Sequence, residues 1–75
     1  MWKMRVEQDG TGRQWDEEIT RQNPNTFKWK PIPKSSSKKK AMEYAESVIE
    51  RFNKTLREGE RMRKVIDVFF DDDQS

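Results

Sequence analysis

The chain has 75 residues, of which 40% are charged and 31% hydrophobic, and its formal net charge is only +2. This length allows one small domain over residues 1–75, and the lack of cysteine and histidine excludes disulfides, thiolate chemistry and the usual zinc sites. No apolar run approaches the roughly 20 residues of a membrane span, and the N-terminus has no secretory h-region. We therefore expect a cytoplasmic protein with no metal site and no cofactor.

The N-terminal part of the chain predicts a β-hairpin. Trp2 to Glu7 alternates apolar and polar residues, which is typical of a strand with one buried face. Asp9 to Gly12 holds two glycines, which supply the positive φ angles of a hairpin turn. Arg13 to Arg21 predicts the return strand, on which Trp15 and Ile19 share a face, and we expect a bulge or an early end there.

Residues 22–37 predict an irregular loop that is basic and contains proline. Pro31 and Pro33 forbid a regular helix and a central strand. The piece from Phe27 to Lys30 fits two structures, a short extended segment or a loop whose aromatic rings fold back onto the sheet. A connection of this length in so small a domain is often functional or mobile.

An amphipathic helix is predicted from about Ser37 to Glu58. The three serines at 35–37 offer N-cap oxygens, and Gly59 fits a C-terminal stop. Apolar residues recur at helical spacing and form one stripe, on which we expect Phe52 to be buried against the sheet. The stripe consists of Ala41, Tyr44, Ala45, Val48, Ile49, Phe52 and Leu56.

The last predicted strand runs from Arg61 to Phe70. Its even-numbered positions hold more apolar residues, so we expect that set to face the helix and Val65 and Phe69 to face away. The even set is Met62, Ile66, Val68 and Phe70. Three aspartates end the strand, and residues 71–75 are predicted to form a disordered acidic tail.

The order strand, strand, helix, strand predicts an α+β fold of the ββαβ kind. Short connections favour a three-stranded antiparallel sheet of order 2-1-3, with the helix packed on one face. The last strand is then an edge, and its outer face offers Val65 and Phe69 as a dimer edge. The alternatives are that the strand has the opposite register, or that the tail covers these two side chains.

The basic block from Lys28 to Lys40 is the main candidate for partner binding, since it carries six lysines and no acid. Three of the lysines open the helix, where the dipole disfavours cations. Aromatic rings between lysines suit single-stranded nucleic acid, and an acidic protein surface would bind the same side chains. The remaining alternative is a solvated loop whose aromatics lie in the core. The candidate residues are Phe27, Lys28, Trp29, Lys30, Lys34, Lys38, Lys39 and Lys40.

The acidic triplets at 16–18 and 71–73 do not predict a metal or acid–base site. Neighbours on a strand alternate faces, so neither triplet converges on one point. A chain without histidine or cysteine, and with little volume for a cleft, offers no catalytic residue. We therefore expect that this protein is not an enzyme.

The sequence YAESVIERFNKTLREGE at residues 44–60 resembles the helix-and-stop segment of small uncharacterised bacterial and phage proteins. The resemblance implies a compact, charged protein that binds and inhibits host machinery. We predict a non-enzymatic binding module, a protein-binding inhibitor or regulator from a phage or mobile element, with an acidic protein as partner. Two alternatives stay open: a nucleic-acid-binding protein that uses Lys28 to Lys40, and a small dimeric structural protein.

Overall fold

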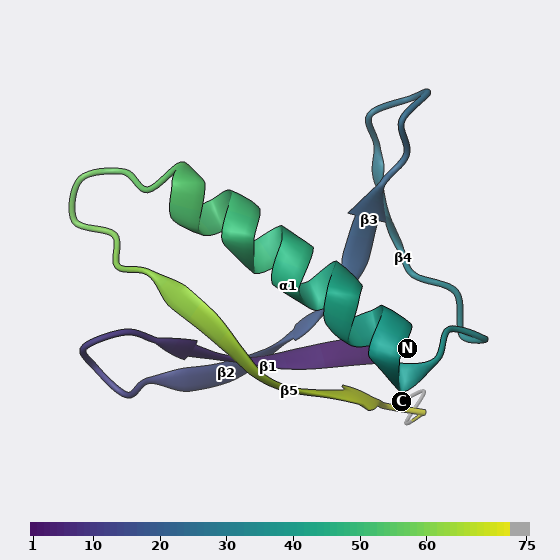
Figure 1. Cartoon of the computed structure of the whole chain (residues 1–75), viewed down its shortest axis with the longest axis horizontal. Coiled ribbons are helices and arrows are strands. Elements are labelled where there is room, and N and C mark those ends of the chain that lie inside the picture. Colours follow the sequence, from purple (N-terminus) through teal and green to yellow (C-terminus); the bar gives the residue numbers. More distant parts are fainter. Residues whose placement is uncertain (73–75) are drawn as a thin grey trace.

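The computed structural model describes residues 1–72 and places them in two sheets and one helix. Strand β1 (Trp2–Gln8) lies between β2 (Gln14–Glu18) and β5 (Arg63–Phe70), and both neighbours run antiparallel to it. Helix α1 (Lys38–Lys54) crosses one face of this main sheet (Figure 1). The predicted α+β fold is confirmed, as is the position of the first strand at the centre of the sheet.

The predicted return strand is interrupted at Ile19. Its first part is β2, and its second part, β3 (Thr20–Gln22), leaves the main sheet to pair with β4 (Trp29–Pro31). The Ile19 amide donates to the Trp2 carbonyl oxygen at 3.0 Å, and the Ile19 carbonyl accepts from the Ile32 amide at 3.2 Å. Because the side chains of Ile19 and Ile32 are both buried, this point joins the two sheets.

The β3–β4 hairpin projects from the body of the molecule (Figure 1), and we call residues 20–31 the arm. Of the two structures that fit Phe27 to Lys30, the extended one is present in part, since β4 begins at Trp29. The prolines allow it because Pro31 is the last residue of a strand that pairs with β3 alone. Residues 32–37 then lead to α1 without regular structure.

The core lies between α1 and the main sheet. The Ser37 hydroxyl accepts a hydrogen bond from the Lys40 amide at 3.1 Å, so the predicted N-cap is present. Three positions of the predicted apolar stripe are fully buried, whereas Phe52 is only half-buried, with the Arg63 guanidinium 3.8 Å from its ring centroid. The core residues are Met4, Val6, Ile19, Ile32, Ala41, Ala45, Ile49 and Val68.

The helix ends at Lys54, earlier than the predicted end at Glu58. The Thr55 hydroxyl donates to the Arg51 carbonyl at 3.1 Å, and the Thr55 amide donates to a carbonyl of the last turn. These bonds close the helix before Leu56. Gly59 has a φ of +86° in a turn of the following loop, so its predicted role as the helix stop is wrong.

Strand β5 contains a β-bulge that overturns the predicted orientation of Val65. The register shifts between Arg5 and Val6, so Val65 lies opposite Val6 and Ile66 is left without a partner on β1. Val65 therefore packs against the core instead of facing away from the helix. Phe69 lies on the outer face, where the Arg5 guanidinium is 5.6 Å from its ring centroid. Ile66, expected to face the helix, is 40% exposed.

The outer face of the main sheet carries polar pairs across the strands. Arg5 Nε donates to the Asp16 carboxylate at 3.0 Å. The Glu7 carboxylate accepts from Gln14 Nε2 at 2.9 Å and lies 3.1 Å from Lys64 Nζ. The hydrogen bond from Gln14 and the ammonium group of Lys64 hold the pKa of Glu7 below its ordinary value.

The two ends of the described chain lie together. The Met1 amino group donates to the Asp71 carbonyl at 2.6 Å, and the Asp71 amide donates to the Met1 carbonyl at 2.8 Å. These bonds extend the pairing of β1 with β5 by one residue pair. Residues 73–75 of the predicted acidic tail lie outside the described residues.

Candidate functional site

The turn of the arm is fixed by hydrogen bonds between its own residues. The Asn23 amide donates to the Lys28 carbonyl at 2.8 Å, and the Phe27 amide donates to the Asn23 carbonyl at the same distance. The Asn23 side chain accepts from the Asn25 amide at 2.8 Å, as an Asx-turn requires. Gln22 Nε2 donates to the Phe27 carbonyl at 3.0 Å. The tip of the arm therefore has one defined backbone conformation.

Phe27 occupies a position of this turn that disfavours a phenylalanine. Its φ is +59°, in the left-handed region, where a residue with a bulky side chain is held at a cost of about 1 kcal/mol or more. Burial of the ring does not offset this cost, since the residue is 72% exposed. Asparagine or glycine would satisfy the same turn with less strain. The identity of Phe27 therefore does not stabilise the arm.

The two faces of the arm differ in character. Gln22 pairs with Trp29 on the face toward α1, and Arg21 lies directly opposite Lys30 on the other face. Like charges in that arrangement repel each other and destabilise the hairpin. Neither cation has an ion pair with any residue of 1–72. The face that carries Arg21 and Lys30 is thus basic and uncompensated.

Helix α1 holds the other face of the arm in place. Arg51 Nη1 donates to the Gln22 side chain at 3.1 Å, and its guanidinium lies 5.3 Å from the ring centroid of Trp29. Trp29 keeps 46% of its surface exposed. A cleft of about 350 Å³ separates arm and helix, and Tyr44 and Ser47 contribute to its helix wall. Sequence periodicity places Arg51 on the polar side of the helix and gives no sign of its contact with Trp29.

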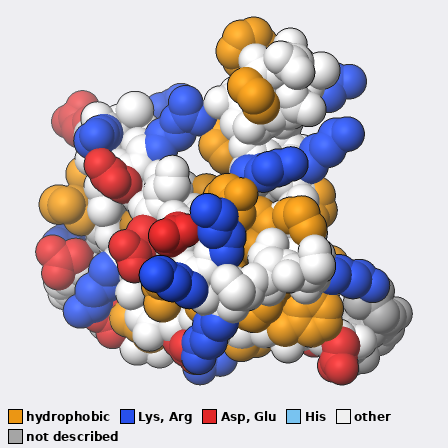
Figure 2. Space-filling model, turned by 45° about the vertical axis from the view of Figure 1, so that its right-hand side comes forward, with side chains coloured by type: hydrophobic (Ala, Val, Ile, Leu, Met, Phe, Trp, Pro, Cys, Tyr) orange, Lys and Arg blue, Asp and Glu red, His pale blue; other side chains and the backbone are white. Residues whose placement is uncertain are grey.

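The structure divides the predicted basic block. Phe27, Lys28, Trp29 and Lys30 lie on the arm, whereas the lysines at 38–40 open α1 at a different part of the molecule (Figure 1). Figure 2 shows hydrophobic side chains at the outer end of the arm and basic ones along its flank.

The lysines outside the arm are partly neutralised. Lys38 Nζ lies 3.8 Å from the Asp67 carboxylate, and Lys40 Nζ lies 3.5 Å from that of Glu43. Lys34 and Lys39 are exposed and make no ion pair with the described residues. The predicted residues therefore do not form one continuous site, and the compact cluster is the one on the arm.

Residues 1–72 contain no group of three or more acidic side chains placed to hold a metal ion. In the same range, α1 is too short and too polar to cross a membrane. The candidate site is the surface of the arm, with its aromatic tip and its cations.

Comparison with protein-family models, with curated proteins and with solved structures found no match to this chain. The resemblance of residues 44–60 to small bacterial and phage proteins stays a prediction.

Proposed function

We propose that this protein is a non-enzymatic binding module, an inhibitor or regulator, whose arm binds an acidic surface of another protein. The observation that carries the proposal is Phe27, an exposed aromatic ring on a backbone conformation that disfavours it. Strained residues gather at binding and catalytic sites because a function there outweighs the loss of stability. Exposed aromatic side chains are also the residues that most often dominate binding energy in interfaces.

The charges of the arm favour an acidic partner. Arg21 and Lys30 repel each other in the free protein, and carboxylates of a partner would relieve that repulsion. Lys28 adds a third cation beside Phe27, and no acidic residue occurs in the sequence between Glu18 and Glu43. Such a surface also speeds the encounter with an acidic protein.

Trp29 supplies a second aromatic contact that is already in position. Its ring is held by the Arg51 guanidinium, and Arg51 is itself fixed by the Gln22 side chain. A side chain that is ordered before binding loses less conformational entropy in the complex. We therefore assign Phe27 and Trp29 as the anchors, with Arg21, Lys28 and Lys30 around them.

Nucleic acid is the second candidate ligand, because an exposed ring between lysines offers a stacking surface beside backbone charges. The distribution of the remaining charge favours the protein partner. Two of the lysines that open α1, Lys38 and Lys40, lie near carboxylates, and the whole chain carries 14 acidic residues. The cations that lie beside exposed aromatic rings are those of the arm, which is short for tracking a phosphate backbone.

The experiment is capture from nuclease-treated bacterial lysate on the immobilised protein, with wild type and Phe27→Asn compared side by side. Asparagine tolerates the left-handed region, so the variant keeps the turn and loses only the ring. We expect proteins that wild type captures to be depleted at least tenfold on the variant, since loss of an anchor costs about 2 kcal/mol. Phe69→Thr is the matched control on the outer face of the main sheet, and it should capture as wild type does.

Equal capture by wild type and Phe27→Asn would overturn the proposal. A ligand that disappears after nuclease treatment points to nucleic acid instead. In that case affinity should fall steeply between about 50 and 200 mM salt, because each phosphate contact releases a counterion. A protein held by Phe27 and Trp29 should show a much weaker salt dependence.

A further inference from the structure

The outer edge of β5 is not paired with any other strand of residues 1–72. Met1 and Asp71 form two backbone hydrogen bonds with each other. In an antiparallel pair, the N–H and C=O groups of successive residues point alternately toward and away from the partner strand. Val68 and Phe70 therefore turn their backbone groups toward the open edge. In agreement, the Val68 amide is bound by the carboxylate of Asp67, at 2.9 Å, and not by β1.

The same alternation of backbone groups holds before the bulge. The Asp9 amide donates to the Met62 carbonyl at 2.9 Å, so Met62 and Lys64 turn toward β1. Arg63 and Val65 then turn their backbone groups outward, where the amide and the carbonyl of Arg63 are both bound by the Asn53 side chain at 2.8 Å. The backbone groups that β5 presents to a partner strand are therefore those of Val65 before the bulge, and those of Phe70 with the Val68 carbonyl after it.

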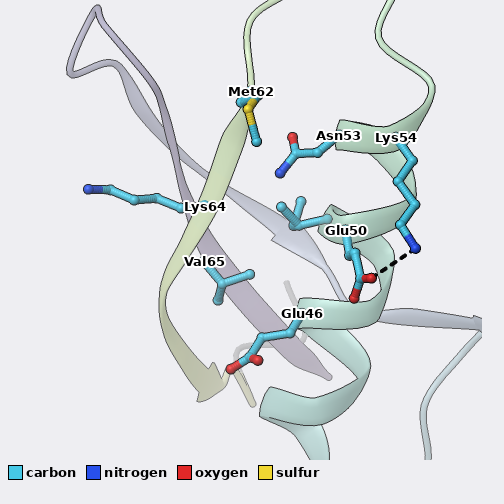
Figure 3. A pocket seen from close by; sticks show the side chains of 8 residues that line it. Glu46, Glu50, Asn53, Lys54, Met62, Lys64 and Val65 are labelled. Carbon is cyan, nitrogen blue, oxygen red and sulfur yellow. Dashed lines mark ion pairs between the residues drawn. The ribbon is translucent and has the colours of Figure 1, made fainter.

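A groove of about 430 Å³ lies beside this edge, between β5 and α1. Figure 3 shows Val65 and Met62 on one side of it and residues of the helix on the other. Its floor is apolar, made by Ile49, Val65 and Met62, and Met62 is 52% exposed. The rim on the helix is charged, with Glu46 and the Glu50–Lys54 ion pair.

We propose that a second copy of this chain adds its β5 antiparallel to this edge, so that two three-stranded sheets join into one. The charges along the strand favour this occupant. Arg61 stands at one end and Asp72 at the other, each exposed and without an ion pair to residues 1–72, with a largely apolar stretch between them. Antiparallel pairing about a two-fold axis sets the basic end of each copy against the acidic end of the other, and this happens twice.

The bulge defines the register of the pairing. Val65 lies on the helix side of the sheet before the bulge, and Val68 lies on that side after it. Residues directly opposite each other on paired strands share a face, and a register with Val65 opposite Val68 of the second copy satisfies this on both sides of the bulge. In this register Arg61 lies opposite Asp72 of the second copy, at both ends of the interface.

The two helices then lie on the same face of the joined sheet. The groove between β5 and α1 gains a floor from β5 of the second copy and a wall from its helix. The exposed side chain of Ile66, close to the two-fold axis, loses contact with water in the pair. The groove and the edge are in this way covered by one partner.

Asp67 keeps the association weak. Its carboxylate accepts a hydrogen bond from the Val68 amide and lies 3.8 Å from Lys38 Nζ. In the monomer it therefore shields this edge from pairing with another strand. Pairing requires this carboxylate to release the Val68 amide. We therefore expect a dimer that forms reversibly at high micromolar concentration.

The test uses sedimentation equilibrium on two charge-reversal variants, Arg61→Glu and Asp72→Arg. Both residues are exposed and lie outside the core, so the fold is retained, which circular dichroism checks. Each variant alone sets like charges against each other at both ends, and self-association should weaken roughly tenfold. An equimolar mixture restores both opposite-charge pairs and should dimerise as wild type does.

A wild-type protein that stays monomeric up to millimolar concentration overturns the dimer, and a mixture that does not recover overturns the antiparallel register. Phe27→Asn should associate as wild type does, since the arm takes no part in this interface. That variant separates this inference from the proposed function. The arm can fail as a binding site while the β5 edges still pair, and the β5 edges can fail to pair while the arm still binds its partner.

Discussion

Asn53, in the last turn of α1, is the residue whose side chain ties the helix to the strand that follows it. Its Oδ1 accepts from the Arg63 amide and its Nδ2 donates to the Arg63 carbonyl, both at 2.8 Å. The amide thus pairs with the first residue of β5 in the way a neighbouring strand would. No pattern in the sequence indicates this contact, because the two residues are joined only by way of an irregular loop.

We predict that Asn53→Ala lowers the free energy of unfolding by about 1–3 kcal/mol, because two half-buried backbone groups lose their partners. Urea denaturation followed by circular dichroism measures the change. Asn53→Asp keeps the acceptor and loses the donor, so its stability should lie between those of wild type and the alanine variant. An alanine variant as stable as wild type would show that water replaces both bonds.

Glu7 makes the fold sensitive to acid. Its pKa is lowered in the folded state, first by the hydrogen bond from Gln14 and then by Lys64. A lowered pKa means that Glu7 stabilises the fold above its unfolded-state pKa, and that this contribution is lost as the pH falls through the folded-state pKa. The loss is therefore expected below the ordinary glutamate value of 4.5.

We predict that Glu7→Gln flattens the fall in thermal stability at acidic pH. Melting temperatures from neutral pH down to about pH 3 measure this, on the scale set by ordinary carboxyl pKa values. Glu43→Gln is the control, since its carboxylate is exposed and its ion pair within residues 1–72 is with Lys40, at 3.5 Å. If both variants lose stability as steeply as wild type, Glu7 is not a source of the acid sensitivity.

At the level of elements, β5 shows how one extra residue changes the faces of a strand. Val65 packs against the core and Phe69 lies on the outer face. We predict that Val65→Lys destabilises the fold by about 2 kcal/mol or more, because a charge enters an apolar contact. Phe69→Lys should stay within about 1 kcal/mol of wild type, because Phe69 lies on the outer face of the main sheet, where its ring contacts Arg5.

Thermal denaturation of the two lysine variants, each compared with wild type, measures the difference. Equal stability of the two, or a less stable Phe69→Lys, would mean that the bulge is misplaced and that strict alternation holds along β5.

The elements that depend on short-range patterns could be predicted from the sequence. Alternation from Trp2 and helical spacing from Ala41 give β1 and α1 and the face each buries, and the turn glycines give the first hairpin. The bulge in β5 could not be predicted, since no residue type marks Ile66 as extra. The predicted end of α1 at Glu58 is wrong, because a glycine at position 59 fits both a helix stop and a turn of a loop.

At the level of the whole molecule, the chain divides into a body with a core and an arm with almost none. The body and the arm meet at Ile19 and Ile32. This contact joins segments that are separated in the sequence, so no local sequence pattern predicts it. The candidate residues of the arm could be named from the sequence, because the aromatics and lysines alternate there. Their exposure, and the roles of Arg21 and Arg51, follow only from the pairing of β3 with β4 and from the position of α1.

We infer that Phe27 serves a contact outside the fold, and the free energy of unfolding of Phe27→Asn tests this most directly. Guanidinium denaturation of wild type and variant under identical conditions gives the difference. We predict that the variant is as stable as wild type or more stable by up to about 1 kcal/mol, because the left-handed backbone no longer carries a phenylalanine. A variant less stable than wild type by more than about 1 kcal/mol would show that the ring supports the fold, and would contradict a role of Phe27 outside it.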